Sequence, residues 1–228
     1  MAMRERAVEA IFFDMDGTIV DTEMLWAEAM VEYLADRGIS GDKDEIISIV
    51  YGHAWSAIYE KIVALYPRTS VVSVNEMAVE LRDYYIKLRN ERDISIPESV
   101  ECLRRLSAHY PIAIVSGSTR IDIGDTIKLM GLESNVLFYL GSEDYQYGKP
   151  HPMCYEMAAE RLGADPERCI VIEDSRAGIR SAKAAGMRCV ALVLEGALQQ
   201  EIDGADLVLS SLADFGYEEA ERVVKNGA

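Results

Sequence analysis

Short runs of consecutive apolar residues recur along this chain, and polar clusters follow several of them. Uninterrupted apolar runs bounded by turn residues are typical of strands that are buried on both faces of a parallel sheet. Between most of these runs, apolar residues recur at helical spacing. Alternating strands and helices indicate an α/β fold with a doubly wound parallel sheet. The predicted strands span residues 8–14, 112–115, 136–140, 169–172, 189–194 and 206–209.

The stretch between the first two strands has a different pattern. From about residue 22 to residue 90, apolar residues recur at helical spacing and no strand-like run interrupts them. A helical stretch of this length between two strands of one sheet indicates an inserted all-helical domain. We therefore expect an α/β core made of residues 1–20 and 96–228, with residues 21–95 forming the helical domain.

Polar clusters follow four of the predicted strands. Because the carboxyl ends of parallel strands meet at one edge of a sheet, and ligands bind beyond that edge, we expect these clusters to converge. Asp14 and Asp16 share one face of an extended chain, where they repel each other. A divalent cation with a preference for oxygen ligands, such as Mg²⁺, would offset that repulsion. The clusters are Asp14-Met15-Asp16-Gly17-Thr18, Ser116-Gly117-Ser118, Gly148-Lys149-Pro150 and Glu173-Asp174.

Taken singly, most of these clusters have an ordinary explanation. Asp14 and Asp16 are common turn or N-cap residues, and Ser118 or Thr119 is a suitable N-cap for a following helix. A lysine in a loop, such as Lys149, is usually solvated. The occurrence of all the clusters after strands of one predicted sheet favours a functional site.

In order and in residue type, the clusters resemble motifs I to IV of the haloacid dehalogenase (HAD) superfamily of aspartyl-phosphate-forming hydrolases. The resemblance implies a Rossmann-like core, a nucleophilic Asp14 and a general acid and base at Asp16. It also implies phosphate binding by Ser116, Gly117 and Lys149. The Mg²⁺ ligands that it implies are Asp14, the Asp16 main-chain carbonyl, Asp174 and Glu173, the last directly or through water.

The residue at position 16 narrows the implied chemistry. Dehalogenases of this superfamily lack the second Asp, phosphonate-cleaving members carry a small residue there, and ATPase-type members carry Thr. With Asp16 present, the resemblance implies a Mg²⁺-dependent phosphatase. Its substrate would be a small phosphorylated metabolite, with a sugar phosphate preferred, and it would act through an aspartyl-phosphate.

An insertion directly after motif I resembles the C1 cap of subfamily I, with hinges at about residues 20–22 and 94–97. Trp26, His53 and Trp55 are the expected contacts to the leaving group, although each side chain would also suit a structural role. Mutases of the β-phosphoglucomutase type carry His and Arg where this chain has Trp26 and Trp55. We therefore prefer a hydrolase to a phosphosugar mutase, and a non-catalytic binding protein on the same fold is the third hypothesis.

Composition limits the partners. The net charge of −16 over 228 residues argues against nucleic acid or an anionic membrane as partner, and it means that a phosphate substrate needs local cations. No apolar run approaches the roughly 18 residues of a membrane helix, and the start of the chain leaves no room for a signal peptide. We expect a cytoplasmic monomer whose four scattered cysteines are free, buried thiols.

Overall fold

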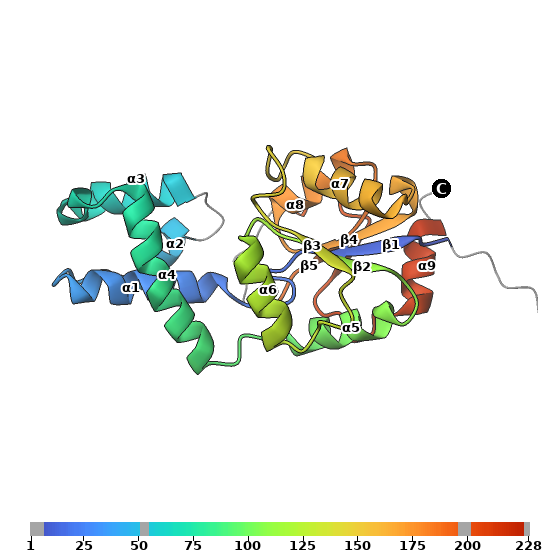
Figure 1. Ribbon diagram of the computed structural model, residues 1–228, viewed down its shortest axis with the longest axis horizontal. Helices are drawn as coiled ribbons and strands as arrows, with labels where there is room; N and C mark the ends of the chain where they lie inside the picture. The colour runs from blue at the N-terminus through green and yellow to red at the C-terminus, as the bar shows by residue number, and fades with distance from the viewer. Residues whose placement is uncertain (1–6, 51–54, 196–201, 226–228) are drawn as a thin grey trace, which may run out of the picture. The chain divides into compact units, whose positions relative to one another are not determined.

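The computed structural model describes residues 7–50, 55–195 and 202–225 of the chain. The chain divides into two compact units. One comprises the chain up to Val20 together with the chain from Ser95 onward, and the other comprises Asp21–Ile94. The first unit contains a sheet with helices on both faces, and the second is built of helices (Figure 1).

Within the described residues, the sheet has six strands, all parallel, in the order β3-β2-β1-β4-β5-β6. β1 therefore lies between β2 and β4, and Phe12 pairs with Ala113 on one side and Val171 on the other. The predicted parallel α/β sheet is confirmed. The strands are β1 (Ala10–Phe13), β2 (Ile112–Val115), β3 (Phe138–Leu140), β4 (Cys169–Glu173), β5 (Arg188–Leu192) and β6 (Leu207–Leu209).

Helices cover both faces of this sheet, which explains why β1 and β2 are apolar at every position and β4 at every position before Glu173. On one face, alternate residues of the strands pack against Tyr155 and Ile179 in a buried core. All four cysteines are free and buried, as predicted. In Figure 1, α7 (Met153–Leu162) and α8 (Arg176–Ala184) lie on one face of the sheet; α5 (Pro97–Ser107), α6 (Arg120–Leu129) and α9 (Tyr217–Lys225) lie on the other.

The inserted unit is helical, as predicted. Its helices are α1 (Glu23–Asp36), α2 (Lys43–Val50), α3 (Trp55–Leu65) and α4 (Val74–Glu91), with a short 3₁₀ turn at Pro67–Val71. α1 and α4 pack together and are linked by the Arg37–Glu80 and Lys87–Glu32 ion pairs, at 2.5 Å and 3.2 Å. α4 begins with a capping box in which Ser73 and Glu76 bond each other's backbone N–H.

The segments that lead into and out of the insert are bonded to each other. Val20 forms an antiparallel bridge with Ser95, and Ile96 N donates to Ile19 O at 2.9 Å. Asp21 N donates to Ile94 O at 2.9 Å. The chain therefore leaves the sheet-containing unit and returns to it at adjacent points.

Candidate active site

The strand order brings the predicted polar clusters together. Asp14 and Asp16 follow β1, Ser116 follows β2 and Asp174 follows β4, so three neighbouring strands supply four side chains to one edge. The hydrogen bonding between β1 and β4 extends one residue past the end of β1, where Asp14 N donates to the Ile172 carbonyl at 2.9 Å. The sheet thus fixes the backbone from which these side chains extend.

Lys149 places a positive charge among the carboxylates. Its Nζ donates to Asp14 Oδ1 at 2.5 Å, to Glu173 Oε1 at 2.6 Å and to the Val115 carbonyl at 3.0 Å. Burial by itself disfavours the ammonium, but the carboxylates of Asp14 and Glu173 outweigh it and hold the pKa of Lys149 well above its usual value. Lys149 is therefore a fixed cation beside the predicted nucleophile.

Asp14 is also buried, with 7% of its surface exposed. Burial raises the pKa of the Asp14 carboxyl above its usual range. Lys149 opposes this effect, and the nearby carboxylates of Glu173 and Asp16 add to it. A further positive charge next to Asp14 would stabilise its ionised form, which is the form that a nucleophile needs.

Glu173 is fully buried and well supplied with hydrogen-bond donors. Its Oε1 accepts from Lys149 and from Tyr155 Oη at 3.1 Å, and its Oε2 accepts at 3.0 Å from Asp174 N, Ser175 N and Ser175 Oγ. A Cβ at Gly178 would lie only 1.7 Å from Glu173 Oε1, so the carboxylate occupies space that only glycine leaves open. These contacts hold Glu173 against Lys149.

Asp16 is held by the loop after β2. Ser116 Oγ and Ser118 Oγ both donate to Asp16 Oδ2, at 3.2 Å and 2.6 Å. Tyr145 Oη donates to the Ser116 carbonyl at 2.7 Å and thereby ties this loop to the segment that carries Lys149. A Cβ at Gly117 would meet nothing within 4 Å, so the fold leaves space beside that backbone.

The carboxylates of Asp14, Glu173 and Asp174 present oxygen atoms that all lie within 4.8 Å of one another. Gly17, at φ +79°, makes room for this arrangement, since a Cβ there would lie 2.1 Å from Asp174 Oδ2. An all-oxygen donor set suits a hard cation such as Mg²⁺. The residues present therefore fit the implied metal.

The residues predicted to contact the leaving group belong to the helical insert. Trp26 stacks on Tyr85 with ring centroids 4.0 Å apart, and Trp55 Nε1 donates to the Val74 carbonyl at 3.1 Å. His53 lies outside the described residues. Both tryptophans thus have partners within their own unit, and their role in substrate contact stays a prediction.

Sequence reasoning did not assign site roles to Ser118, Tyr145 and Tyr155. Ser118 was predicted as a member of the polar cluster after the second strand and as a possible N-cap, a position that Thr119 occupies in the structure. The second hydroxyl of Ser116-Gly117-Ser118 was the available signal for Ser118. No local pattern marks the tyrosines, because their partners come from other strands and loops.

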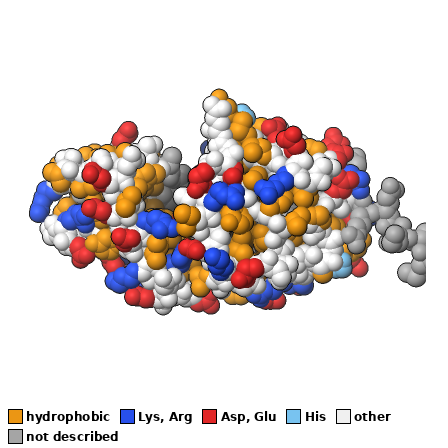
Figure 2. All heavy atoms as spheres, in the orientation of Figure 1, with side chains coloured by type: hydrophobic (Ala, Val, Ile, Leu, Met, Phe, Trp, Pro, Cys, Tyr) orange, Lys and Arg blue, Asp and Glu red, His pale blue; other side chains and the backbone are white. Residues whose placement is uncertain are grey.

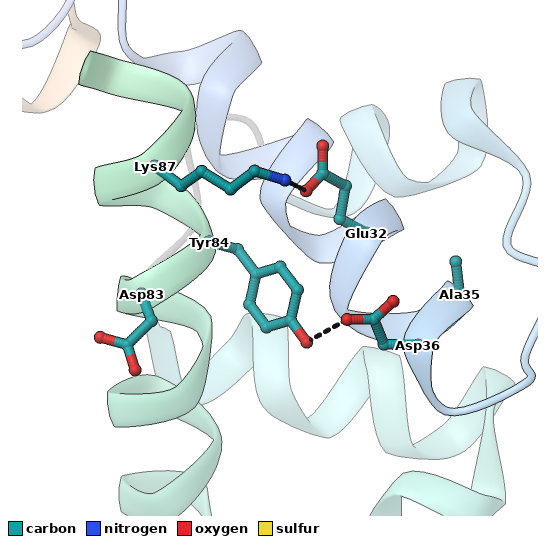
Figure 3. A pocket seen from close by; sticks show the side chains of 6 residues that line it. All are labelled: Glu32, Ala35, Asp36, Asp83, Tyr84 and Lys87. Carbon is teal, nitrogen blue, oxygen red and sulfur yellow. Dashed lines mark hydrogen bonds and ion pairs between the residues drawn. The ribbon is translucent and has the colours of Figure 1, made fainter. Parts of the chain in front are cut away.

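The helical unit has a pocket of its own, of about 440 Å³, between α1 and α4 (Figure 3). Lys87 bonds Glu32 and Tyr84 bonds Asp36 across it, and Asp83 adds a further carboxylate. A phosphate would meet mostly negative charge there, so this pocket is a poor candidate for the phosphate site.

The surface carries charges of both signs. On the face drawn in Figure 2, Lys and Arg side chains lie among Asp and Glu side chains. Among the described residues, no helix combines the length and the hydrophobicity that a membrane crossing requires.

The chain is similar to known proteins over most of its length. Residues 11–192 match the model of a family described as haloacid dehalogenase-like hydrolase. Bifunctional riboflavin kinase/FMN phosphatase from Arabidopsis thaliana is 30% identical over 216 residues, which cover 91% of this chain and 54% of that protein. The chain therefore spans about half the length of that relative.

Two further relatives match over nearly their whole length. Fructose-1-phosphate phosphatase from Escherichia coli is 27% identical over 180 residues, covering 79% of this chain and 94% of that protein. The crystal structure of β-phosphoglucomutase from Clostridium difficile has a TM-score of 0.77 and 25% identity, covering 96% of this chain and 98% of that one.

Proposed function

The chain belongs to the haloacid dehalogenase-like hydrolase family, and we propose that it is a Mg²⁺-dependent phosphatase acting on a small phosphorylated metabolite. The observation that carries the proposal is the meeting of Asp14, Lys149 and Asp174 at one sheet edge, with Asp16 two residues from the nucleophile. A sugar phosphate is our preferred substrate class, supported by the similarity to a fructose-1-phosphate phosphatase.

In the proposed reaction, an Asp14 carboxylate oxygen attacks phosphorus. The new O–P bond forms as the ester P–O bond breaks, and the leaving oxygen takes a proton from Asp16. Water then attacks phosphorus of the aspartyl-phosphate and gives a proton to Asp16. This step releases inorganic phosphate and restores the Asp14 carboxylate and the protonated Asp16. Ser116, Gly117 and Lys149 hold the transferring phosphoryl group.

Mg²⁺, held by Asp14, the Asp16 main-chain carbonyl and Asp174, would neutralise negative charge on the phosphoryl group. Glu173 has a different environment, because five donors from the described residues already reach its two oxygens. We therefore assign Glu173 chiefly to the support of Lys149, with any contact to the cation made through water.

We also propose that the helical insert is a cap that admits the substrate and excludes water, as the resemblance implies. The segments near residues 20–22 and 94–97 would then act as hinges. Trp26, His53 and Trp55 are the proposed contacts to the leaving group. Because the insert is tethered at adjacent points, its movement would leave the sheet unchanged.

The test measures phosphate release from p-nitrophenyl phosphate by the purified chain with Mg²⁺. EDTA should abolish activity and added Mg²⁺ should restore it. Asp14→Asn should lower kcat by about a thousandfold or more, because it removes the nucleophile. Asp214→Asn, at an exposed position of the same unit, is the matched control. Full activity in EDTA, or in the Asp14→Asn variant, would contradict the proposal.

The similarity to β-phosphoglucomutase keeps a phosphosugar mutase as the second candidate. A mutase primed by a sugar bisphosphate would interconvert glucose 1-phosphate and glucose 6-phosphate. We expect phosphate release without isomerisation, since Trp26 and Trp55 stand where such mutases carry His and Arg. Isomerisation faster than phosphate release would reverse this choice.

A further inference from the structure

Asp16 is bonded to two hydroxyl groups through a single oxygen. Ser118 Oγ lies 2.6 Å from Asp16 Oδ2, and Ser116 Oγ lies 3.2 Å from the same atom. Both bonds hold Oδ2 toward the loop after β2. Oδ2 is therefore taken as the anchored atom, and the proton that Asp16 exchanges is assigned to Oδ1.

The two serines are not equivalent when substrate is bound. A hydroxyl has one proton to donate. Ser116 is proposed to bind a phosphoryl oxygen, and when its proton is used there, it no longer donates to Asp16. Ser118 has the shorter bond to Asp16, so it is the hydroxyl of this pair that keeps Asp16 anchored during the reaction.

The backbone around Ser118 is fixed on both sides. Ser118 N donates to Ser116 Oγ at 3.0 Å, and the Ser118 carbonyl accepts from Ser142 N at 2.9 Å. The next residue, Thr119, caps α6 by accepting from Asp122 N. A side chain on such a restrained backbone can hold its partner in one orientation.

Hydrogen bonds also hold Arg120, two residues after Ser118. Arg120 N donates to the Glu143 carboxylate at 3.0 Å and 3.2 Å, and Arg120 Nη1 bonds both oxygens of Asp144, at 2.8 Å and 2.9 Å. A Cβ at Gly141 would lie 2.8 Å from Arg120 N, so the two segments approach as closely as backbone allows.

From these contacts we propose that Ser118 is a positioning residue for proton transfer by Asp16. Its hydroxyl anchors Oδ2 and so directs the Oδ1 proton to the leaving oxygen as the ester P–O bond breaks. The inference rests on the proposed function, in which Asp16 is the general acid. The proposal adds Ser118 to the residues that affect the rate of hydrolysis. Its effect should be largest for esters whose leaving group must be protonated.

Two aryl phosphates of similar size separate this role from a structural one. Phenol has a pKa of about 10, like tyrosine, so phenolate leaves slowly without a proton. p-Nitrophenolate is a much weaker base and leaves with little help. Loss of acid catalysis therefore slows the hydrolysis of phenyl phosphate more than the hydrolysis of p-nitrophenyl phosphate.

The experiment compares kcat/KM for the two esters with Mg²⁺ in the full chain. Ser118→Ala should lower the ratio of phenyl to p-nitrophenyl phosphate hydrolysis about tenfold, a fraction of the total that general acid catalysis supplies. Ser118→Thr, which keeps a hydroxyl, should restore most of the ratio. Ser134→Ala, at an exposed serine of the same unit, should leave the ratio unchanged, and thermal melts should show that every variant is folded.

Asp16→Asn separates the two proposals. If Asp16→Asn lowers the ratio and Ser118→Ala leaves it unchanged, the positioning role is wrong and the proposed function stands. If Asp16→Asn leaves the ratio unchanged, the assignment of Asp16 as general acid is wrong, and the role of Ser118 is wrong with it. The inference predicts that the phenyl to p-nitrophenyl ratio depends on the hydroxyl at position 118. It is therefore also overturned if Ser118→Ala and Ser118→Thr give the same ratio.

Discussion

At the residue scale, glycine is needed at Gly178 and at Gly117 for different reasons. A Cβ at Gly178 would lie 1.7 Å from Glu173 Oε1, in a part of the fold that is fully buried. A Cβ at Gly117 would meet nothing within 4 Å. The fold itself requires Gly178, whereas Gly117 is required only if a ligand approaches its backbone.

Gly178→Ala should therefore reduce both stability and activity. The Glu173 carboxylate must move, which weakens its bond to Lys149, and overpacking of this kind costs about 1–3 kcal/mol. Alanine is intrinsically better than glycine within a helix such as α8, by about 1 kcal/mol, so a measured loss would come from the clash. Denaturant unfolding and kcat/KM check this, and a variant as stable and active as the parent would contradict it.

Gly117→Ala should instead weaken substrate binding and leave stability nearly unchanged. We expect its unfolding free energy to stay within about 0.5 kcal/mol of the parent. KM for a phosphate ester should rise several-fold, since the new methyl group would stand where phosphate oxygens approach the backbone. A destabilised variant would contradict the open space at Gly117, and an unchanged KM would show that its backbone does not contact the phosphate.

At the scale of elements, α9 is held to the start of the sheet by one buried carboxylate. Glu221, 5% exposed, accepts from Ala7 N at 3.0 Å and Val8 N at 3.2 Å, ahead of β1. Tyr110 Oη donates to it at 3.1 Å, and Lys225 Nζ lies 3.0 Å away. Burial raises the pKa of Glu221, but these donors outweigh burial and hold the pKa below its usual value.

Glu221→Gln should destabilise the chain by about 1–3 kcal/mol near neutral pH, because it removes charge-assisted hydrogen bonds from a buried site. A carboxyl with a depressed native pKa contributes stability above its unfolded pKa of about 4.3. This contribution is lost as the pH falls through the lower, native pKa. The difference between parent and variant should thus shrink on acidification. Glu218→Gln, whose side chain is 84% exposed on the same helix, should show neither effect.

The elements themselves were predicted unevenly. Each predicted strand corresponds to an observed strand whose ends differ by no more than a few residues, because an apolar run is a local signal. α9 was not predicted. It is only nine residues long and most of them are polar, so it offers few apolar positions from which a helical pattern could be recognised.

At the scale of the whole molecule, the bonded ends of the insert bear on how the chain folds. Val20 pairs with Ser95 within the sheet-containing unit, and 21–94 is a separate compact unit. A long insertion whose ends are adjacent adds little to the entropy cost of closing the loop. The sheet-containing unit should therefore be able to fold without it.

We expect a chain in which residues 21–94 are replaced by a short Gly-Ser linker to fold cooperatively. Circular dichroism melts and near-ultraviolet spectra check this against the intact chain. A single sharp transition with retained near-ultraviolet signal supports independent folding. A broad transition with exposed apolar surface would show that the sheet needs the helical insert for its stability.

The sequence by itself determined the α/β class, the helical insertion and the polar clusters that follow the strands, because periodicity and turn chemistry are properties of neighbouring residues. The resemblance of those clusters to HAD motifs added the family, and the match over residues 11–192 confirms it. Only the tertiary structure decided that Lys149 lies between Asp14 and Glu173, and that Ser118 bonds Asp16. These partners meet because β1 lies between β2 and β4, and the order of strands in a sheet depends on packing over the whole core rather than on any local pattern.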